Sequence, residues 1–250
     1  MPFAEPRVVA NTDSCWFYHT MDLPGTGLVE GHWDLRGRLN DYLGGVALNG
    51  RRVLDVGTAS GFLSFGMEQE GAQVTSFDTE RVENYNVVPF WNNLYTLNYP
   101  CWREETSKFL EKLRNSYWFA YGALNSACER YEGDVYDIPE EVGQFDVVVV
   151  GQILVHLRDP LAALASVAKR CRHTLVIAEG MDPTEVPLAN FHPRFESHGP
   201  DSSWWQYSRG LYSEFLQILG FKDLHFTSHD YRCNAANANV EITTVVANRR

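Results

Sequence analysis

Arg52-Val53-Leu54-Asp55-Val56-Gly57-Thr58-Ala59-Ser60-Gly61 is the stretch that decides the fold. Its first half is a short run of apolar and β-branched residues, which is typical of a buried strand. Its second half is rich in glycine, which lets a backbone turn tightly and approach a ligand. An apolar helical pattern begins at Phe62, and such a helix points free N–H groups at the turn. The stretch predicts a nucleotide-type crevice at the carboxyl end of a parallel strand.

Two cofactor classes compete for this turn. A dinucleotide fingerprint requires Gly-x-Gly-x-x-Gly, and Ala59 occupies its second glycine position, so that pattern fails. The pattern Asp-x-Gly-x-x-x-Gly from Asp55 to Gly61 instead resembles motif I of the class I S-adenosylmethionine-dependent methyltransferases. Taken alone, the stretch also fits a tight strand-to-helix turn in any other α/β protein.

Composition and charge narrow the class of function. The chain has 250 residues, enough for one large α/β domain, and its net charge of −11 argues against a nucleic-acid docking surface. Aromatic residues make up 13%, which favours an aromatic-lined site for a small molecule. The five cysteines form no Cys-x-x-Cys pair, so they indicate a reducing cytoplasm rather than disulfides or zinc. We expect no signal peptide, no membrane span and no membrane partner, and homodimerisation stays open.

Apolar runs and helical patterns alternate along the chain after the glycine turn. Six further strands are predicted, at 73–78, 128–132, 145–150, 173–178, 221–227 and 240–246, with helices at 106–124, 160–167 and 211–219. This alternation predicts a single domain over residues 1–250, with an α/β, Rossmann-like, seven-stranded and mostly parallel sheet and helices on both faces. The continuous apolar run Phe145–Val150 marks a central parallel strand.

Three segments outside this alternation are expected to surround the site. Residues 1–50 form an N-terminal cap, in which Asp34 begins a short helix. Residues 79–104 form a lid-like aromatic insertion, because Pro89 and Pro100 interrupt any regular pattern, and residues 180–203 form a loop near the site. The side chains predicted to contact the acceptor are Trp16, Tyr18, His32, Trp33, Arg114, Tyr117 and Trp204. Ordinary packing is the alternative role for each of them.

Further cofactor contacts follow from the ends of the predicted strands. Asp78 lies about 20 residues beyond the turn, where an acid can accept from both ribose hydroxyls. Asp134 ends the third strand and is expected to accept from the adenine amino group, while the backbone N–H of Val135 serves a ring nitrogen. The backbone of Gly151 and Gln152 should line the reaction crevice. With these, the predicted cofactor site comprises Asp55, Gly57, Thr58, Ala59, Gly61, Asp78, Asp134, Val135, Gly151 and Gln152.

Nearly the whole chain resembles the class I methyltransferases, on Asp55–Gly61, Asp78, Gly133-Asp134 and Phe145–Pro160. Residues 16–24 with 34–36, and residues 155–160, are similar to bacterial relatives of the tRNA wobble-uridine carboxymethyl-transferring group. The resemblance implies methyl transfer from S-adenosylmethionine. The chain is acidic and shows no basic N-terminal extension, which favours a small-molecule acceptor over tRNA and disfavours a carboxylated cofactor.

Methyl transfer to an oxygen or nitrogen needs a proton removed, and histidine suits that task near neutral pH. His156 is the first candidate for the base and His19 the second, and a bracing role for His156 stays open. Catechol-type enzymes hold a metal with acids near the fourth strand end, where Gly151-Gln152 offers none, so metal independence is predicted. His192, Glu196 and His198 lack the spacing of a preorganised metal site. The remaining alternatives are an NAD-dependent oxidoreductase and a non-catalytic cofactor-binding protein.

Overall fold

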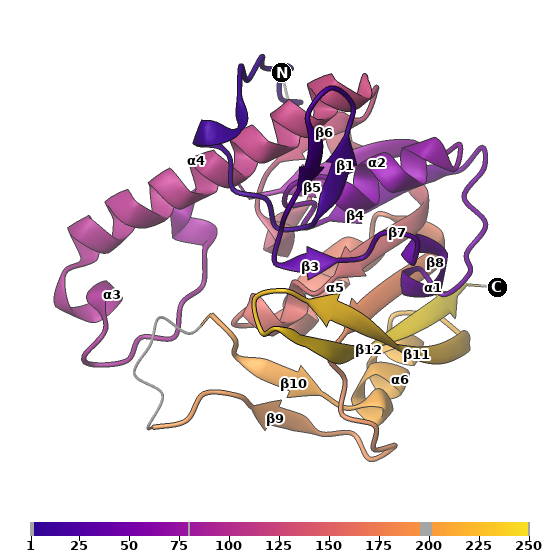
Figure 1. Ribbon diagram of the computed structural model, residues 1–250. Coiled ribbons are helices and arrows are strands. Elements are labelled where there is room, and N and C mark those ends of the chain that lie inside the picture. The colour runs from indigo at the N-terminus through magenta and orange to yellow at the C-terminus, as the bar shows by residue number, and fades with distance from the viewer. Residues whose placement is uncertain (1–2, 80, 196–201, 250) are drawn as a thin grey trace.

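An eight-stranded mixed sheet forms the centre of the protein in a computed structural model, which describes residues 3–79, 81–195 and 202–249 (Figure 1). Its strands are β3 (Trp33–Asp34), β4 (Arg52–Val56), β5 (Gln73–Asp78), β6 (Glu129–Glu132), β7 (Phe145–Gly151), β8 (Cys171–Glu179), β11 (Asp223–Cys233) and β12 (Ala238–Asn248). Their order is β3-β11-β12-β8-β7-β4-β5-β6. The five strands from β8 to β6 run parallel, so their carboxyl ends meet at one edge of the sheet.

The described residues contain six α-helices: α1 (Leu39–Tyr42), α2 (Phe62–Gln69), α3 (Leu94–Leu97), α4 (Tyr99–Leu124), α5 (Pro160–Ala168) and α6 (Arg209–Ile218). Residues of α1, α2 and α4 share one hydrophobic cluster with Val147 and Val149, and those of α5 and α6 share another with Val148 and Val150. Because alternate β7 side chains enter opposite clusters, both faces of this strand are buried. This confirms the Rossmann-like α/β fold with helices on both faces of a mostly parallel sheet.

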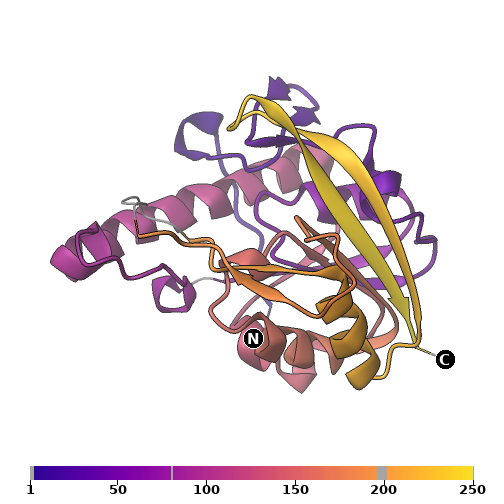
Figure 2. The same cartoon turned by 90° about the horizontal axis from the view of Figure 1, so that it is seen from below.

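The sheet has one more strand than the sequence predicted, and the difference lies in the N-terminal cap. Trp33 and Asp34 pair with Cys233 and Arg232, at the far end of the long β11–β12 hairpin. Figure 2 shows this hairpin extending well beyond the other strands. The prediction that Asp34 begins a helix was therefore wrong, and α1 begins only at Leu39. The hairpin extends past the parallel strands, so Asp34 can pair with β11. No pattern in the residues around Asp34 predicts this pairing.

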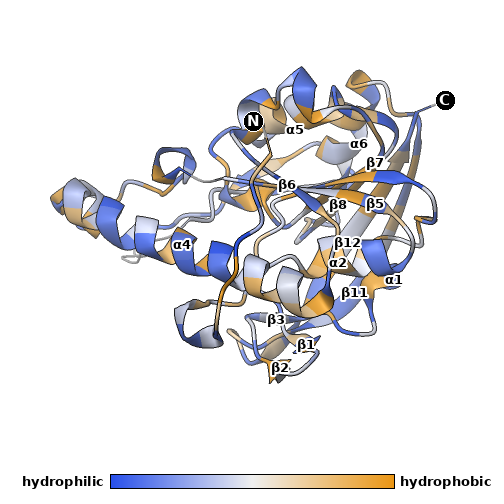
Figure 3. Ribbon diagram, turned by 90° about the horizontal axis from the view of Figure 1, so that it is seen from above, coloured by the Kyte–Doolittle hydropathy of each residue, from blue (hydrophilic) through white to orange (hydrophobic). Residues whose placement is uncertain are grey.

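The 79–104 insertion is more regular than its sequence indicates. It contains a 3-10 helix at Val82–Asn84, helix α3 and the first turn of α4. Pro100 lies in that first turn, where a missing N–H costs no hydrogen bond, and the Asn98 side chain accepts from Cys101 N at 3.2 Å. Helix α4 thus begins at Tyr99, not near residue 106. Its outer half projects from the domain with alternating hydrophilic and hydrophobic turns (Figure 3).

Two short antiparallel sheets complete the fold. One joins β1 (Met21–Leu23) to β2 (Gly27–Val29) in the N-terminal cap, and the other joins β9 (Ala189–Phe191) to β10 (Trp205–Tyr207). The second sheet lies within and after the segment predicted as a loop at 180–203. Among the described residues, no helix combines the length and apolar character needed to cross a bilayer.

Candidate active site

The glycine turn between β4 and α2 can be built only from residues that tolerate left-handed backbone. Gly57 has φ +83° and Gly61 has φ +90°. A Cβ atom on Gly57 would collide with the Ile153 side chain of the β7 loop, and one on Gly61 would collide with Phe65. Ala59 also adopts a positive φ, of 49°. The turn is therefore strained at Ala59 and closely approached at Gly57, as expected of a loop that cradles a ligand.

A buried network of hydroxyl groups supports the turn from beneath. Ser64 Oγ donates to Asp55 Oδ2 at 2.6 Å and lies 2.8 Å from Thr58 Oγ1. Ser76 Oγ donates to Ser64 Oγ at 2.7 Å, and the Tyr117 hydroxyl donates to Ser76 Oγ at 2.9 Å. Burial raises the pKa of Asp55 to about 6. Asp55 and Thr58 thus brace the turn, while Asp55 Oδ1 has no hydrogen-bond partner among the described residues.

Asp78 closes the other side of the turn. Its Oδ2 accepts from Ala59 N at 2.8 Å and its Oδ1 accepts from Thr79 N at 2.7 Å. A carboxylate oxygen has two lone pairs, so each still has capacity for a ligand hydroxyl. Burial raises the pKa of Asp78, and the nearby charge of Arg130 opposes that rise. Asp78 is therefore fixed to the glycine turn and oriented by two backbone amides.

The end of β6 completes this side of the crevice. Gly133 N donates to Asp78 O at 2.9 Å, which brings Asp134 and Val135 next to the end of β5. Asp134 caps the 3-10 helix Val135–Asp137 by accepting from Tyr136 N at 3.0 Å. Both Asp134 and Val135 are half-buried. The structure thus brings together the two acids predicted to hold ribose and adenine.

Arg114 and Tyr117 of α4, which are predicted to contact the acceptor, both contact groups of β6. Arg114 Nε lies 3.1 Å from Glu132 Oε1, which Arg130 Nε also contacts at 3.1 Å. The Tyr117 ring is fully buried, and the Arg130 guanidinium carbon lies over it, 4.4 Å from the ring centroid. The geometry therefore places Tyr117 in the core beneath the glycine turn, and Arg114 in an ion-pair network beside Asp78.

The loop after β7 borders the turn from the opposite side. Gly151 leaves room for the Tyr42 hydroxyl, because a Cβ there would lie 3.0 Å from it. Gln152 has φ +51° and donates its backbone N–H to Ala178 O at 2.8 Å. Gln152 Nε2 is buried with no hydrogen-bond partner among the described residues. Strain and an unsatisfied donor in one residue are typical of a loop built for a ligand.

His156 follows in the 3-10 helix Leu154–His156. Its Nδ1 lies 3.2 Å from both the carbonyl oxygen and the side-chain oxygen of Ser202. Because a carbonyl only accepts, a hydrogen bond to Ser202 O requires the proton on Nδ1. Trp204 N donates to Val155 O at 2.7 Å, and Tyr85 forms a hydrogen bond with the Ser202 side chain. Residues from three distant segments thus meet at His156.

His19 approaches the glycine turn from the N-terminal cap. Its backbone N–H donates to Ser60 Oγ at 3.2 Å, and its ring lies 5.4 Å from that of Phe62. The side chain is buried, Nδ1 has no hydrogen-bond partner among the described residues, and burial lowers the pKa to about 3. His19 is therefore a neutral imidazole at physiological pH, and a weak base.

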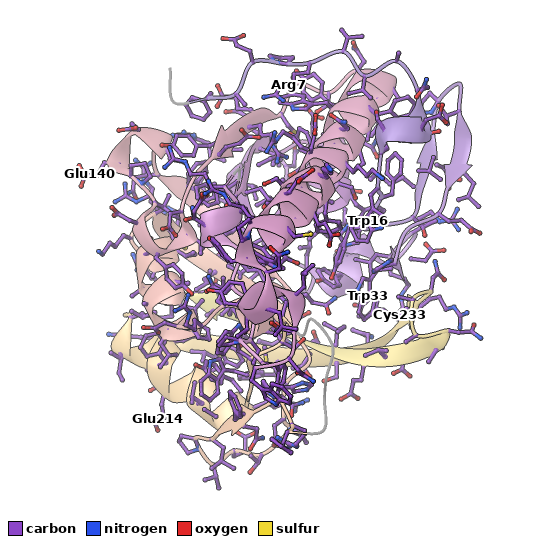
Figure 4. All side chains as sticks on the ribbon, turned by 90° about the vertical axis from the view of Figure 1, so that its left-hand side faces the viewer. Arg7, Trp16, Trp33, Glu140, Glu214 and Cys233 are labelled. Carbon is purple, nitrogen blue, oxygen red and sulfur yellow. The ribbon has the colours of Figure 1, made fainter. Side chains whose placement is uncertain are left out.

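The aromatic residues of the cap form a connected group above α4. Trp16 packs edge-on against His32 at 4.6 Å and against Phe109 at 4.8 Å. Figure 4 shows Trp16 and Trp33 between α4 and the hairpin that carries Cys233. Trp33 is buried in β3, whereas His32 is exposed. Tyr18, whose pKa burial raises to about 12, connects this group to His19 through a ring contact at 4.8 Å.

Several residues near the crevice were missing from the predicted site. They are Ser64 and Ser76 beneath the turn, Tyr85 and Ser202 beside His156, and Glu179 at the end of β8. Glu179 could have been found by the rule that identified Asp78, an acid at the carboxyl end of a parallel strand. The other four carry no comparable signal.

The described part of the chain contains no group of three or more His, Cys, Asp or Glu side chains that could hold a metal ion. Of the three residues considered for a metal in the sequence, only His192 is described, and it is exposed. Glu196 and His198 lie outside the described residues.

The chain belongs to a methyltransferase-domain family, whose profile matches residues 34–210. It is an S-adenosylmethionine-dependent methyltransferase domain. No curated protein matches it in sequence. Nothing in these comparisons supports the closer resemblance to the tRNA wobble-uridine group.

Solved structures with the same fold are distant in sequence. The N-terminal domain of EvdMO1, in the presence of S-adenosylhomocysteine and D-fucose, is 18% identical, with a TM-score of 0.53 over 96% of this chain and 93% of that one. Magnesium protoporphyrin IX methyltransferase from Synechocystis PCC 6803, with bound S-adenosylmethionine, is 14% identical, with a TM-score of 0.51 over 85% and 76%. Human N-acetylserotonin methyltransferase, in complex with S-adenosylmethionine, is 14% identical, with a TM-score of 0.52 over 86% and 52%.

Proposed function

We propose that this protein transfers the methyl group of S-adenosylmethionine to an oxygen or nitrogen of a small-molecule acceptor. The observation that carries the proposal is that the glycine turn, with Asp55 and Asp78, lies against the aromatic cap. His19 of the cap donates its backbone N–H to Ser60 in the turn, and its ring contacts that of Tyr18. Two of the solved structures described above are named for small molecules, protoporphyrin and N-acetylserotonin, which supports this acceptor class.

The residues around the glycine turn fit S-adenosylmethionine. Asp78 would accept from the ribose hydroxyls, and Asp134 with the Val135 backbone would receive the adenine. Asp55 Oδ1 and Gln152 Nε2 are buried polar atoms without a hydrogen-bond partner among the described residues. The absence of a Cβ at Gly57 lets the Ile153 side chain of the β7 loop lie directly against the turn. Gly61, Thr58 and Ala59 shape the turn. The sulfonium supplies an already activated methyl group, so the protein's main task is to align the acceptor and exclude water.

His156 is proposed as the general base for the acceptor proton, and His19 as the second candidate. Ser202 orients the His156 ring through Nδ1, which is how a second group selects the working tautomer of histidine. His19 is already neutral, but a pKa near 3 makes it a poor proton acceptor. A positioned base contributes typically 10²–10⁴-fold to rate. Trp16, Tyr18, His32, Trp33 and Trp204 are proposed to enclose the acceptor.

Calorimetric titration tests the cofactor site directly. We expect micromolar binding of S-adenosylmethionine and S-adenosylhomocysteine and none of NAD. Binding of NAD alone would instead favour an oxidoreductase. A screen of small hydroxyl- and amine-bearing acceptors with labelled methyl donor follows, with His156→Ala as the comparison. Uniformly full activity of that variant would remove His156 as the base.

Metal independence is part of the same proposal. Activity on an acceptor found in that screen should persist in a strong chelator, and recovery of lost activity by Mg²⁺ would contradict it. The five cysteines are free thiols, which supports a reducing compartment such as the cytoplasm.

A further inference from the structure

Glu179 is a buried acid that the proposed reaction does not yet use. It ends β8, is 4% exposed, and pairs with Thr243 of β12 in the interior of the sheet. Its side chain leaves the sheet on the face covered by α5 and α6, since Ile177 and Leu175, two and four residues earlier, belong to the hydrophobic cluster on that face. The carboxyl group therefore lies just beneath the loop that follows β7.

The carboxyl group binds the backbone of that loop. Glu179 Oε1 accepts from Leu154 N at 2.9 Å, and the Val155 amide also donates to the carboxyl group. Leu154 is the first residue of the 3-10 helix that ends at His156. Amides at the start of a helical turn have no partner within it, so an acid there supplies what the turn lacks.

No cation accounts for the position of this acid. Among the ion pairs of the described residues, none includes Glu179. The ionisable groups that face it are three tyrosines, Tyr18 of the cap, Tyr42 of α1 and Tyr212 of α6. Burial raises the pKa of Tyr18 to about 12 and the pKa of Tyr42 and of Tyr212 well above its usual value, so all three stay neutral. The two backbone amides are thus its principal polar partners.

A small cavity adjoins the carboxyl group between Leu154, Trp205 and Tyr212, with about 10 Å³ of space for the centre of a water molecule. This is close to the least volume that holds one ordered water. Burial raises the pKa of Glu179 to about 8, so a neutral carboxyl group predominates at pH 7 and has a proton to donate. A water in the cavity would accept it, which leaves Oε1 to the loop.

We propose that Glu179 is a positioning residue, whose carboxyl group binds the Leu154 and Val155 amides and thereby holds the turn that presents His156 to the acceptor. That His156 is presented to the acceptor rests on the proposed function. The contact of Glu179 with the turn does not, because it is present in the protein without cofactor or acceptor. Glu179 thus acts through His156 and needs no contact with cofactor or acceptor.

The test uses the full chain, with and without S-adenosylhomocysteine, and two NMR readouts. They are amide exchange at Leu154 and Val155 and the ¹⁵N ring shifts of His156, assigned with His156→Ala. Glu179→Ala should speed exchange of the two amides at least about tenfold, the factor expected for one lost hydrogen bond to a polar buried group. It should also shift the His156 ring signals. Glu179→Gln keeps a side-chain oxygen in place and should restore both readouts.

Asp146→Ala is the matched control. Asp146 is a half-buried acid at the opposite end of β7, where it also accepts a backbone amide, Arg52 N at 3.0 Å. Asp146→Ala should leave the amide exchange of Leu154 and Val155 and the ring shifts of His156 unchanged. Equal effects of Asp146→Ala and Glu179→Ala, or an unaltered His156 ring in Glu179→Ala, would overturn the proposal. If Glu179→Ala does not fold, Glu179→Asp withdraws the carboxyl group by one methylene and must give the same faster exchange.

Calorimetry with S-adenosylhomocysteine separates the two proposals. Normal binding with unchanged His156 signals in the variants would refute the positioning role and leave the methyltransferase function standing. If the wild type does not bind S-adenosylhomocysteine but the variants show the NMR effects, the positioning role stands and the proposed methyltransferase function is refuted.

Discussion

The two halves of the proposed active site are built in different ways: a cofactor half around β4, β5 and β6, and an acceptor half around β7 and β8. The half around β4, β5 and β6 takes its groups from the turns directly after those strands, such as Asp78 and Gly133. The half around β7 and β8 is assembled from the cap, the insertion, the β7 loop and the segment before β10, which meet at His156, Ser202 and Glu179. Parallel strands alone suffice to place the first half. The second depends on contacts between segments more than 100 residues apart in the chain, such as that of Tyr85 with Ser202.

The largest expected effect tests the cofactor half. Gly57→Ala places a Cβ against Ile153 at φ +83°, and we expect at least a roughly 100-fold loss of S-adenosylhomocysteine affinity by calorimetry, from strain plus displacement of the β7 loop. Gly50→Ala is the control, because Gly50 has φ +72° but open space at Cβ. Similar losses in both variants would show that general strain, not the Ile153 contact, matters.

Asp78 should matter more than Asp134 within this half. Asp78→Ala removes a carboxylate that can accept from the ribose hydroxyls, and a single hydrogen bond to a charged group contributes about 1.5–3 kcal/mol, so we expect binding to weaken at least roughly 10–100-fold. Asp134→Ala should weaken binding by only a few-fold, because Asp134 would accept a single hydrogen bond at a half-buried position, where water competes for the carboxyl group. Calorimetry at constant pH measures both. The reverse order would mean that adenine recognition, not ribose recognition, dominates.

Glu179 gives a smaller, pH-dependent effect in the acceptor half. Its pKa is about 8 in the folded protein against an ordinary 4.5, so its contribution to stability is complete below pH 4.5 and is lost as pH rises through 8. Glu179→Gln removes this dependence, so the fall in Tm between pH 6.5 and 9 should shrink by roughly a few degrees. Asp55, whose pKa is about 6, acts mostly below that window. An unchanged slope in the variant, measured by calorimetric unfolding, would contradict the assignment.

The smallest expected effect concerns His19, whose protonation state should not change with pH in the neutral range. Its pKa of about 3 predicts that its ring NMR signals stay constant between pH 8 and 5, because the imidazole remains neutral throughout. His19→Gln identifies those signals, and exposed His192 provides a comparison within the same spectra. A His19 titration near pH 6 would show that the cap opens to water and would return His19 to the list of bases.

The predictions from sequence succeeded where neighbouring residues decide the outcome. The apolar run Phe145–Val150 is a central strand because both faces of it are buried, and Gly57 and Gly61 have the positive φ values that their turn requires. The predictions failed where the conformation of a segment depends on a partner distant in the chain. Asp34 joins a strand and does not begin a helix, because Arg232 of β11 lies beside it.

The sequence by itself determined the family, the Rossmann-like fold and the glycine turn that we propose as the cofactor site, since hydrophobic period, glycine spacing and strand-end acids are local properties. Only the tertiary structure decided which cap and loop residues meet at His156, that His19 is buried and neutral, and that Glu179 binds the β7 loop. Burial and the pairing of a side chain with a distant backbone amide depend on how the whole chain packs. No spacing of residues encodes them directly.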